Sequence, residues 1–275
     1  MDIFLPILIP VLIFLVAGGA IGFGLSFLGE KLKIERDPRI DDVLRFLPGI
    51  NCGGCGSAGC DSFAKKLVAG EADVSSCNPC SPQNRENIGK RLGRNVENSR
   101  PTVAVVHCNG GNRCRNKYSY QGYGDCRAAE MIAGGAKACT VACLGLSSCV
   151  SACKYGAAVI DKDKAVSVVL SENCTSCGAC VSACPKKIIS RIPVDAKVYI
   201  ACSNPWKGKD IRPICPVGCI ACGRCEKECP EHAIEVSNNL AMIDYDKCTG
   251  CGRCVTVCPS KCILPYEYKG ECSEK

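Results

Sequence analysis

The sequence predicts an α+β protein with an N-terminal transmembrane helix followed by small domains built around cysteine ligands. Three observations lead to this fold class. The first thirty residues carry almost no charge, 28 of the 275 residues are cysteines, and aromatic residues make up only 5% of the chain. A chain with so few aromatic side chains has little to bury in one large core. Inorganic centres are therefore expected to organise it.

The N-terminal segment is a candidate membrane anchor. Residues 3–29 contain no charged side chain, and this length suffices for one membrane-spanning helix. A cleaved signal peptide is the alternative, but it would begin with basic residues, whereas this chain begins with an acidic one. Lys31, Lys33 and Arg36 follow the span, which the positive-inside rule places in the cytoplasm. We expect residues 1–29 to be a single-pass anchor in the cell inner membrane.

Three cysteine runs share the spacing Cys-x2-Cys-x2-Cys-x3-Cys-Pro. The runs consist of Cys174, Cys177, Cys180 and Cys184; Cys219, Cys222, Cys225 and Cys229; and Cys248, Cys251, Cys254 and Cys258. This is the spacing of bacterial ferredoxins, in which three thiolates hold one [4Fe–4S] cluster and the fourth crosses to the partner cluster. Zinc ribbons use paired Cys-x2-Cys knuckles instead. The spacing therefore predicts bacterial-type two-cluster ferredoxin modules.

Crossed ligands come in pairs, so three runs leave one run without a partner. A deviant fourth copy lies upstream and consists of Cys139, Cys143, Cys149 and Cys153. When the copies are overlaid, Leu146 stands at the position of Cys222. We expect Cys139 to supply the thiolate that Leu146 does not. The alternative is that this half-site is empty.

The segments between the paired runs predict an internal repeat. Residues 157–170 and 233–245 each read as a strand, a polar turn and a second strand. Each repeat also begins with a short apolar segment that ends at a cysteine, Cys108 or Cys202. We therefore expect two tandem modules, module 1 over 101–193 and module 2 with a tail over 194–275.

A separate cysteine set precedes both modules and consists of Cys52, Cys55, Cys60 and Cys77. Glycines between the first three let the backbone wrap closely around a cluster. An amphipathic helix with Phe63 and Leu67 on one face is expected to follow. We predict a small 4Fe-4S domain over 30–78, with zinc as the alternative metal, and a polar linker over 79–100.

These assignments use twenty cysteines, which predicts five [4Fe–4S] clusters. The cysteines left over are Cys80, Cys108, Cys114, Cys126, Cys202, Cys215, Cys262 and Cys272. Cys262 aligns with alanine in the other half-sites, which indicates a small buried hydrophobe, and Cys272 lies in a charged tail. Five others, from Cys108 to Cys215, could hold a sixth cluster between the repeats, although their spacing fits no known pattern.

Several function classes find no support. The net charge of +7 does not indicate a nucleic-acid partner, since Lys and Arg are not clustered with aromatic platforms. Each cubane with its thiolates would also add about two negative charges. His107 and His232 lie beside cysteines and are expected to be structural or solvated. No nucleophile–base set or phosphate loop indicates an independent catalytic site.

Taken together, the apolar N-terminal segment, the Cys52-x2-Cys55-x4-Cys60-x16-Cys77 pattern and the ferredoxin-like repeats resemble the B subunit of the Rnf complexes over nearly the whole chain. Cys80 and Lys154 depart from the pattern, because glycine and proline are expected there. The resemblance implies a membrane complex that passes electrons from reduced ferredoxin to NAD⁺ and exports Na⁺ or H⁺. It further implies soluble ferredoxin as donor and membrane and flavin-bearing subunits as partners.

Two other hypotheses stay open at this point. The chain could be a generic membrane-anchored polyferredoxin of a hydrogenase or formate dehydrogenase complex. It could instead be a thiol-rich zinc module without a redox role. The sequence alone does not give the coupling ion or the order of the clusters.

Overall fold

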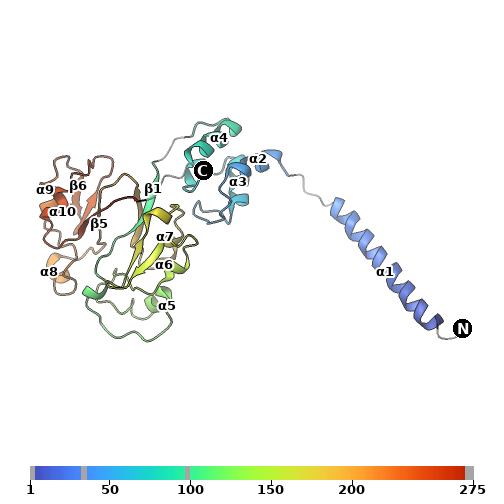
Figure 1. Cartoon of the computed structure of the whole chain (residues 1–275), viewed down its shortest axis with the longest axis horizontal. Coiled ribbons are helices and arrows are strands. Elements are labelled where there is room, and N and C mark those ends of the chain that lie inside the picture. The colour runs from blue at the N-terminus through green and yellow to red at the C-terminus, as the bar shows by residue number, and fades with distance from the viewer. Residues whose placement is uncertain (1–3, 32–35, 97–99, 270–275) are drawn as a thin grey trace. The chain divides into compact units, whose positions relative to one another are not determined.

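The computed structural model describes residues 4–31, 36–96 and 100–269, and the chain divides into two compact units, 1–41 and 42–275 (Figure 1). The α-helices are α1 (Phe4–Lys31), α2 (Pro38–Phe46), α3 (Cys60–Ala69), α4 (Pro82–Leu92), α5 (Cys126–Met131), α6 (Ser148–Ser151), α7 (Ala179–Ala183), α8 (Gly208–Ile211), α9 (Arg224–Lys227) and α10 (Arg253–Val257). The strands are β1 (Thr102–Val106), β2 (Ala158–Asp161), β3 (Val166–Val169), β4 (Ile189–Pro193), β5 (Val198–Ile200), β6 (Ile234–Ser237), β7 (Leu240–Ile243) and β8 (Ile263–Pro265). This mixed content confirms the α+β class.

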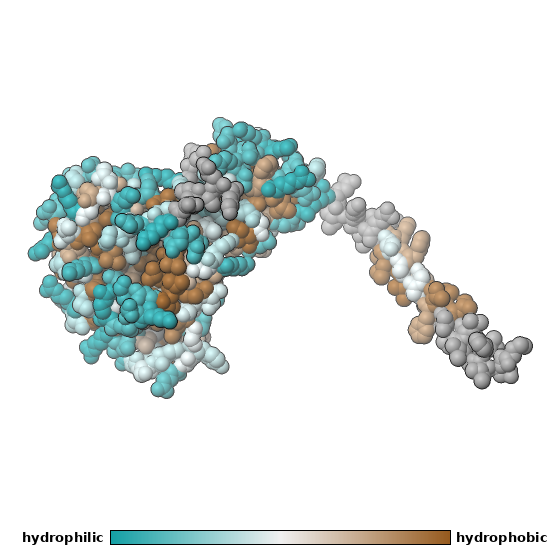
Figure 2. Space-filling view, viewed as in Figure 1, coloured by the Kyte–Doolittle hydropathy of each residue, from teal (hydrophilic) through white to brown (hydrophobic). Residues whose placement is uncertain are grey.

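The first unit contains the apolar helix α1, which has 28 residues. Its described large side chains are exposed, as the brown surface in Figure 2 shows; Phe14 and Phe23 are 78% and 76% exposed. Among the described residues, no helix combines the length and the apolarity needed to cross a membrane. The structure thus does not confirm the predicted anchor. Lys33, one of the charges expected to orient it, lies outside the described residues.

The start of α3 is fixed by a side chain from the preceding glycine-rich loop. The backbone N–H of Cys60 donates to Asn51 Oδ1 at 2.8 Å, and Asn51 itself has a positive φ of 50°. At its other end the helix stops at Gly70, whose left-handed φ of 83° suits a residue without Cβ. Phe63 and Leu67 are fully buried, which confirms the predicted apolar face.

The segment predicted as a linker contains α4, and this helix is packed rather than solvated. Ser81 caps it by accepting from the backbone N–H of Asn84 at 3.2 Å. The buried Arg85 donates to the carbonyl oxygen of Cys77 at 2.9 Å, and Ile88 is fully buried. Residues 82–92 therefore belong with the predicted 4Fe-4S domain, because their apolar and cationic side chains pack against its last cysteine turn.

Each module is made of two antiparallel strand pairs. In module 1 the first strand β1 pairs with the last strand β4, and β2 and β3 form a hairpin between them in sequence. Module 2 repeats the arrangement, with β5 paired to β8 and β6 to β7. The predicted lead strands and strand–turn–strand segments are confirmed.

The cores of the modules consist of aliphatic side chains and cysteines. In module 2, Val198, Ile234 and Ile263 are buried together with several thiols of the cysteine runs. Module 1 buries Ala104, Ile188 and its own cysteines in the same way. This explains how the chain folds with so few aromatic residues, since the cysteines occupy the centre of each module.

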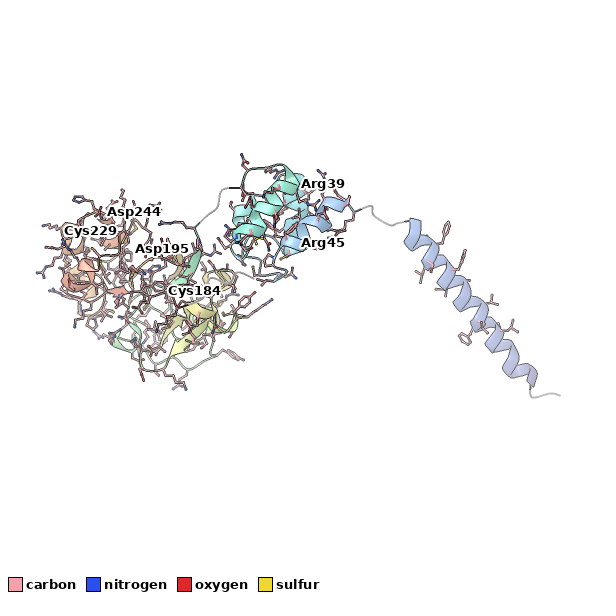
Figure 3. All side chains as sticks on the ribbon, turned by 45° about the horizontal axis from the view of Figure 1, so that its top comes forward. Arg39, Arg45, Cys184, Asp195, Cys229 and Asp244 are labelled. Carbon is pink, nitrogen blue, oxygen red and sulfur yellow. The ribbon has the colours of Figure 1, made fainter. Side chains whose placement is uncertain are left out.

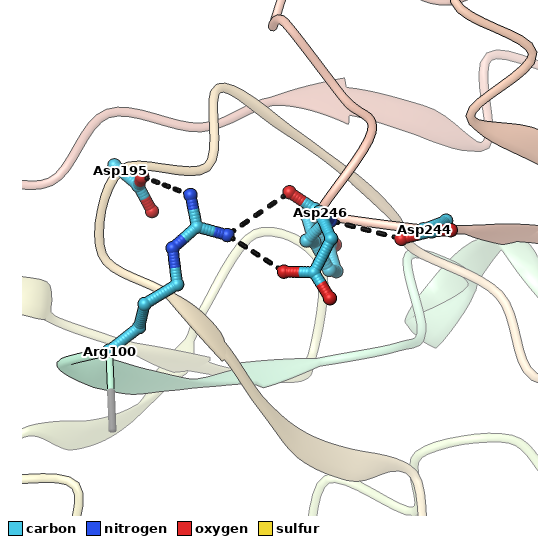
Figure 4. A network of polar contacts seen from close by, with 5 residues as sticks. Arg100, Asp195, Asp244 and Asp246 are labelled. Atoms are coloured by element: carbon cyan, nitrogen blue, oxygen red, sulfur yellow. Dashed lines mark hydrogen bonds and ion pairs between the residues drawn. The ribbon is translucent and has the colours of Figure 1, made fainter. Parts of the chain in front are cut away.

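Polar contacts join the two modules. Nδ1 of His107 lies 2.6 Å from the carbonyl oxygen of Ile200 in module 2. Nε2 of the same ring lies 2.6 Å from Ser190 Oγ. Arg100 bridges Asp195 and Asp246 at 3.1 and 3.0 Å (Figure 4). His107 is thus structural, as expected, because burial lowers its pKa and both ring nitrogens have partners.

Candidate metal centres

Two cavities in module 2 are each lined by cysteines that separate runs contribute. The cavity of about 340 Å³, here called the inner site of module 2, is lined by the run cysteines Cys219, Cys222, Cys225 and Cys258, and by Cys262. A cavity of about 310 Å³, the outer site of module 2, is lined by Cys229, Cys248, Cys251 and Cys254. Each run thus supplies three cysteines to one cavity and its last cysteine to the other. This is the crossed grouping that the ferredoxin spacing predicts.

Local structure explains how the last cysteine reaches the other cavity. Cys225 lies in α9 and Cys254 in α10, and Cys229 and Cys258 follow these helices directly. A glycine with positive φ, Gly223 at 70°, starts α9. The left-handed turn brings three cysteines around one point, and the helix then carries the fourth away from it.

A further cavity in module 1 holds a cysteine that sequence reasoning did not assign. This cavity of about 330 Å³, the inner site of module 1, is lined by Cys126, Cys143, Cys149 and Cys184. Cys184 comes from the next run, so the crossed grouping holds here as well. The position that Leu146 leaves without a thiol is filled by Cys126, which starts α5.

Cys139, which we expected to complete this site, is not among the residues that line the cavity. Cys139 lines a different cavity, and its Sγ accepts a hydrogen bond from the Asn204 side chain of module 2 at 2.9 Å. Cys126 is held at the inner site by two contacts to α6. Its backbone N–H donates to Ser148 Oγ at 2.7 Å, and that hydroxyl donates to Asp125 at 3.0 Å. An aspartate directly before Cys126 is a sequence signal for the start of a helix. It does not indicate which other cysteines Cys126 would join.

The cysteines of the two module 1 runs that do not line the inner site, apart from Cys139, are here called the outer site of module 1; they are Cys153, Cys174, Cys177 and Cys180. Burial raises the pKa of Cys180 to about 12, and the nearby thiols of the other three, together with Cys149, add to the rise. The other three predicted members of this set are therefore neighbours of Cys180. Cys149, which belongs to the inner site, lies next to it as well.

The predicted cysteines of the N-terminal site lie near one another in two overlapping groups, Cys52 with Cys55 and Cys77, and Cys80 with Cys77 and Cys60. Burial raises the pKa of Cys52, and the neighbouring thiols of Cys177, Cys77 and Cys55 act in the same direction. Cys80 is buried beside Cys77, and a hydrogen bond between the two thiols raises the pKa of Cys77 and lowers that of Cys80. The Cys80 thiol is thus an additional neighbour of the site.

Two leftover cysteines are accounted for separately. Cys262 is 2% exposed, as a buried hydrophobe should be, but its Sγ also lies 3.6 Å from Cys258 Sγ. The hydrogen bond between them lowers the pKa of Cys258 to about 5. Cys272 lies outside the described residues.

Burial keeps several of these thiols protonated in the absence of metal. It raises the pKa of Cys143 to about 12 and those of Cys225 and Cys254 to about 11. Binding of a metal centre must therefore release protons, because only thiolates act as ligands. Among the described residues, no three His, Cys, Asp or Glu side chains are placed to hold a single metal ion. In a cubane each thiolate binds a different iron.

Comparisons with known proteins agree with this arrangement. Residues 47–79 match the family described as "Putative Fe-S cluster". Residues 135–185 and 218–262 match two families described as 4Fe-4S dicluster domains. The matched segments contain the N-terminal site and most cysteines of both modules.

Relatives that align with most of the chain show its family. The chain is 42% identical, over 94% of its length and 77% of the relative, to the B subunit of the Na⁺-translocating ferredoxin:NAD⁺ oxidoreductase complex of Acetobacterium woodii. It is 44% identical, over 84% of its length and 88% of the relative, to the B subunit of the ion-translocating oxidoreductase complex of Methanosarcina acetivorans. This chain belongs to the Rnf B-subunit family. The B subunit of the proton-translocating complex of Clostridium ljungdahlii, 36% identical over 85% of this chain, is another member.

Proposed function

We propose that this chain is the electron-relay B subunit of a membrane-bound ferredoxin:NAD⁺ oxidoreductase complex that transports Na⁺ or H⁺. The observation that carries the proposal is the series of four-cysteine sites with crossed grouping in both modules. [4Fe–4S] clusters would supply one-electron oxidation and reduction at these sites. The chain acts within the complex, as one step of its electron transfer.

The residues at each site fit such clusters. The three module cavities measure about 340, 310 and 330 Å³, and each is lined by four cysteines in the crossed grouping, to which the first adds Cys262. The backbone N–H groups of Ser167 and Ala241 point at the Cys143 and Cys219 sulfurs, respectively, where they stabilise the thiolate form. These residues hold the clusters, exclude water from them and tune their potentials through N–H···S contacts.

Module 2 has the features of a docking surface for soluble ferredoxin. Cys222 and Cys251 are the two exposed cysteines of the described runs. Each is followed, two residues later, by an exposed arginine, Arg224 or Arg253. A cationic rim beside an accessible cluster ligand would attract an acidic electron carrier and speed its association.

The opposite end of the relay lies at the N-terminal site. A Cβ on Gly54 would collide with the carbonyl oxygen of Cys177, so the glycine loop lies directly against the outer site of module 1. Burial raises the pKa of Tyr155, and the thiols of Cys177 and Cys52, one from each site, add to the rise. We infer that electrons enter at module 2 and leave from the N-terminal site toward the membrane and flavin-bearing subunits.

We also propose that residues 1–29 anchor the protein in the cell inner membrane as a single span. The uninterrupted apolar sequence supports this, and so do the basic residues that follow it, which favour cytoplasmic cluster domains. Deleting residues 1–29 and fractionating cells tests the proposal. Recovery of the full chain in the soluble fraction, equal to that of the deletion variant, would contradict it.

The relay is tested by mixing the anaerobically purified full chain with reduced ferredoxin and following the visible absorbance. We expect bleaching of the iron–sulfur band by ferredoxin and none by NADH alone. Direct bleaching by NADH would contradict the proposal, and so would a brown protein that ferredoxin does not reduce.

A charge variant locates the docking surface. Arg224→Ala with Arg253→Ala should slow reduction by ferredoxin about tenfold at low salt, with a smaller effect at high salt. Lys154→Ala with Lys162→Ala is the matched control, since it removes the same charge from exposed positions of module 1. Equal slowing in both variants would show that docking is not specific to module 2.

A further inference from the structure

A cavity at the junction of the two modules, here called the junction cavity, is lined by cysteines that the five sites leave unused. They are Cys108, Cys114, Cys139, Cys202 and Cys215. The cavity measures about 320 Å³, within the range of 310 to 340 Å³ spanned by the three module sites. A space of the same size and chemistry as the ferredoxin sites therefore lies between the modules.

The thiols of the junction cavity face a common region. A Cβ built on Gly110 would lie 3.2 Å from the Cys215 sulfur and 3.8 Å from the Cys108 sulfur. These sulfurs come from different modules, so both modules contribute to one space. The same Cβ would lie 3.3 Å from the Cβ of Cys114. Gly110 is thus a position where a side chain would intrude on the thiols.

The sulfurs also receive hydrogen bonds from buried donors. Asn204 is 1% exposed, and its side-chain amide donates to Cys139 Sγ at 2.9 Å. Its orientation is fixed because its oxygen accepts from the backbone N–H of Trp206 at 2.6 Å. A fully buried amide aimed at a sulfur is expected where that sulfur carries negative charge.

The internal repeat places equivalent cysteines on both sides. Cys108 Sγ accepts from the backbone N–H of Cys143 at 3.4 Å, and Cys202 Sγ accepts from that of Cys219 at 3.3 Å. Cys143 and Cys219 belong to the inner sites of modules 1 and 2. The junction cavity therefore adjoins both inner sites through matching contacts.

We propose that the junction cavity is a sixth [4Fe–4S] site, which connects the two modules into one electron path. Its ligands are four of the five thiols, and two come from each module in the symmetric arrangement of Cys108 with Cys139 and Cys202 with Cys215. Cys114 is the additional thiol. Each electron transfer reduces one cluster as its neighbour is oxidised, so no further reactant is needed. The inference rests on the proposed relay function and adds its central step.

The physical need for such a centre follows from the steep decrease of electron transfer with distance. The junction cavity separates the inner site of module 1 from that of module 2, since its walls contact Cys143 on one side and Cys219 on the other. Without a centre there, electrons would have to cross the whole cavity in one step. With one, every step is between adjoining sites.

The test is iron and sulfide content of the full chain, purified anaerobically, against a variant with Cys139→Ala and Cys215→Ala. We expect about 24 irons in the natural protein and about 20 in the variant, at four per cubane. Cys272→Ala is the matched control, because this cysteine lies in the charged C-terminal part of the sequence, apart from every predicted cysteine set, and its loss should leave the iron content unchanged. Equal iron content in the natural protein and the double variant would overturn the proposal, as would zinc in the place of the missing iron.

A kinetic readout separates this site from the relay as a whole. In the double variant, ferredoxin should still reduce module 2 at its normal rate, whereas reduction of the remaining clusters should slow at least tenfold. Unchanged reduction of all clusters would overturn the junction site and leave the relay intact. A natural protein without iron would instead refute the relay function itself.

Misfolding of the double variant would show as loss of more than about four irons. In that case Cys215→Ser, which keeps the side-chain volume, replaces it. We expect this variant to keep the clusters of both modules and to change the electron paramagnetic resonance spectrum of one cluster. A spectrum identical to that of the natural protein would contradict the proposal.

Discussion

The two ferredoxin modules share their strand pairing and their crossed cysteine grouping, yet they present their cysteines to solvent differently. In module 2 the exposed Cys222 and Cys251 each precede an exposed arginine. Their counterparts in module 1, Cys126 and Cys177, are half-buried, and Ser148 replaces one of the arginines. Figure 3 marks one crossing cysteine in each module, Cys184 and Cys229.

The difference shows how one scaffold can present its cysteines in two ways. In module 2 every ligand position of the two regular runs is a cysteine, and one cysteine of each run is exposed. Module 1 takes one cysteine of its inner site from α5, and this Cys126 is half-buried. A cysteine recruited from a distant helix thus changes which thiols meet solvent without changing the strands beneath.

The largest effect is expected from Cys126→Ala. It should open one iron corner at the inner site of module 1 and produce a three-iron centre or loss of that cluster. Adding Leu146→Cys should restore the cluster, because it recreates the regular run of module 2. Cys139→Ala should leave this site intact. Electron paramagnetic resonance and iron content measure all three variants, and an effect of Cys139→Ala on this site in place of Cys126→Ala would contradict the assignment.

A second pair of variants tests whether, in both modules, the last cysteine of a run binds the cluster of the other run. Cys184→Ala should damage the inner site of module 1 and spare the cluster near Cys180. Cys258→Ala should do the same to the inner site of module 2. The reason is that each last cysteine lines the cavity of the other run. If either variant damages the cluster of its own run, as seen by spectroscopy, the modules differ in architecture.

A smaller effect is expected at the position where the modules differ by one hydroxyl. Ser167 Oγ lies 3.0 Å from Cys149 Sγ, whereas module 2 has Ala241 at this position. With a thiolate, the hydroxyl donates and stabilises the more negative reduced cluster. Ser167→Ala should lower the potential by roughly 40–60 mV, the one-electron equivalent of about 1–1.4 kcal/mol.

The reciprocal change serves as the control. Ala241→Ser should raise the potential of the inner site of module 2 by a similar amount, without changing its iron content. Redox titration followed by electron paramagnetic resonance measures both variants. Shifts of the same sign in the two variants would show that the hydroxyl does not act as a hydrogen-bond donor.

The smallest effect concerns the contact between the residue that precedes module 1 and the surface of module 2. Arg100 pairs with Asp195 and Asp246, but all three side chains are more than half exposed. Arg100→Ala should therefore reduce the free energy of unfolding by only about 0.5–1 kcal/mol, a shift of about 1–4 °C in Tm. Lys65→Ala, which breaks an exposed pair in α3, is the control. A drop well above 5 °C would mean that Arg100 holds the modules together.

Regular spacing allowed most of the module structure to be predicted. The crossed grouping of Cys229 and Cys258 follows from the ferredoxin run, and the hairpins follow from strand–turn–strand patterns. Cys126 could not be predicted, because a ligand from a distant helix has no fixed spacing to Leu146. The burial of Arg85 could not be predicted either. A polar segment is typical of a linker, and the sequence does not show which buried groups it contacts.

The junction cavity shows the same limit more strongly. Its cysteines come from two modules, and contacts such as that between Asn204 and Cys139 join residues far apart in sequence. Local patterns carry no information on such pairs. The repeat gave the only hint, because Cys108 and Cys202 end equivalent strands.

The most direct test is an anaerobic structure of the full chain with iron located by its anomalous signal. We predict six cubanes, with Cys126, Cys143, Cys149 and Cys184 around one of them. Another should lie in the junction cavity, between the inner sites of the two modules. An iron centre held by Cys139 together with Cys143 and Cys149, or a junction cavity without iron beside five filled sites, would contradict this arrangement.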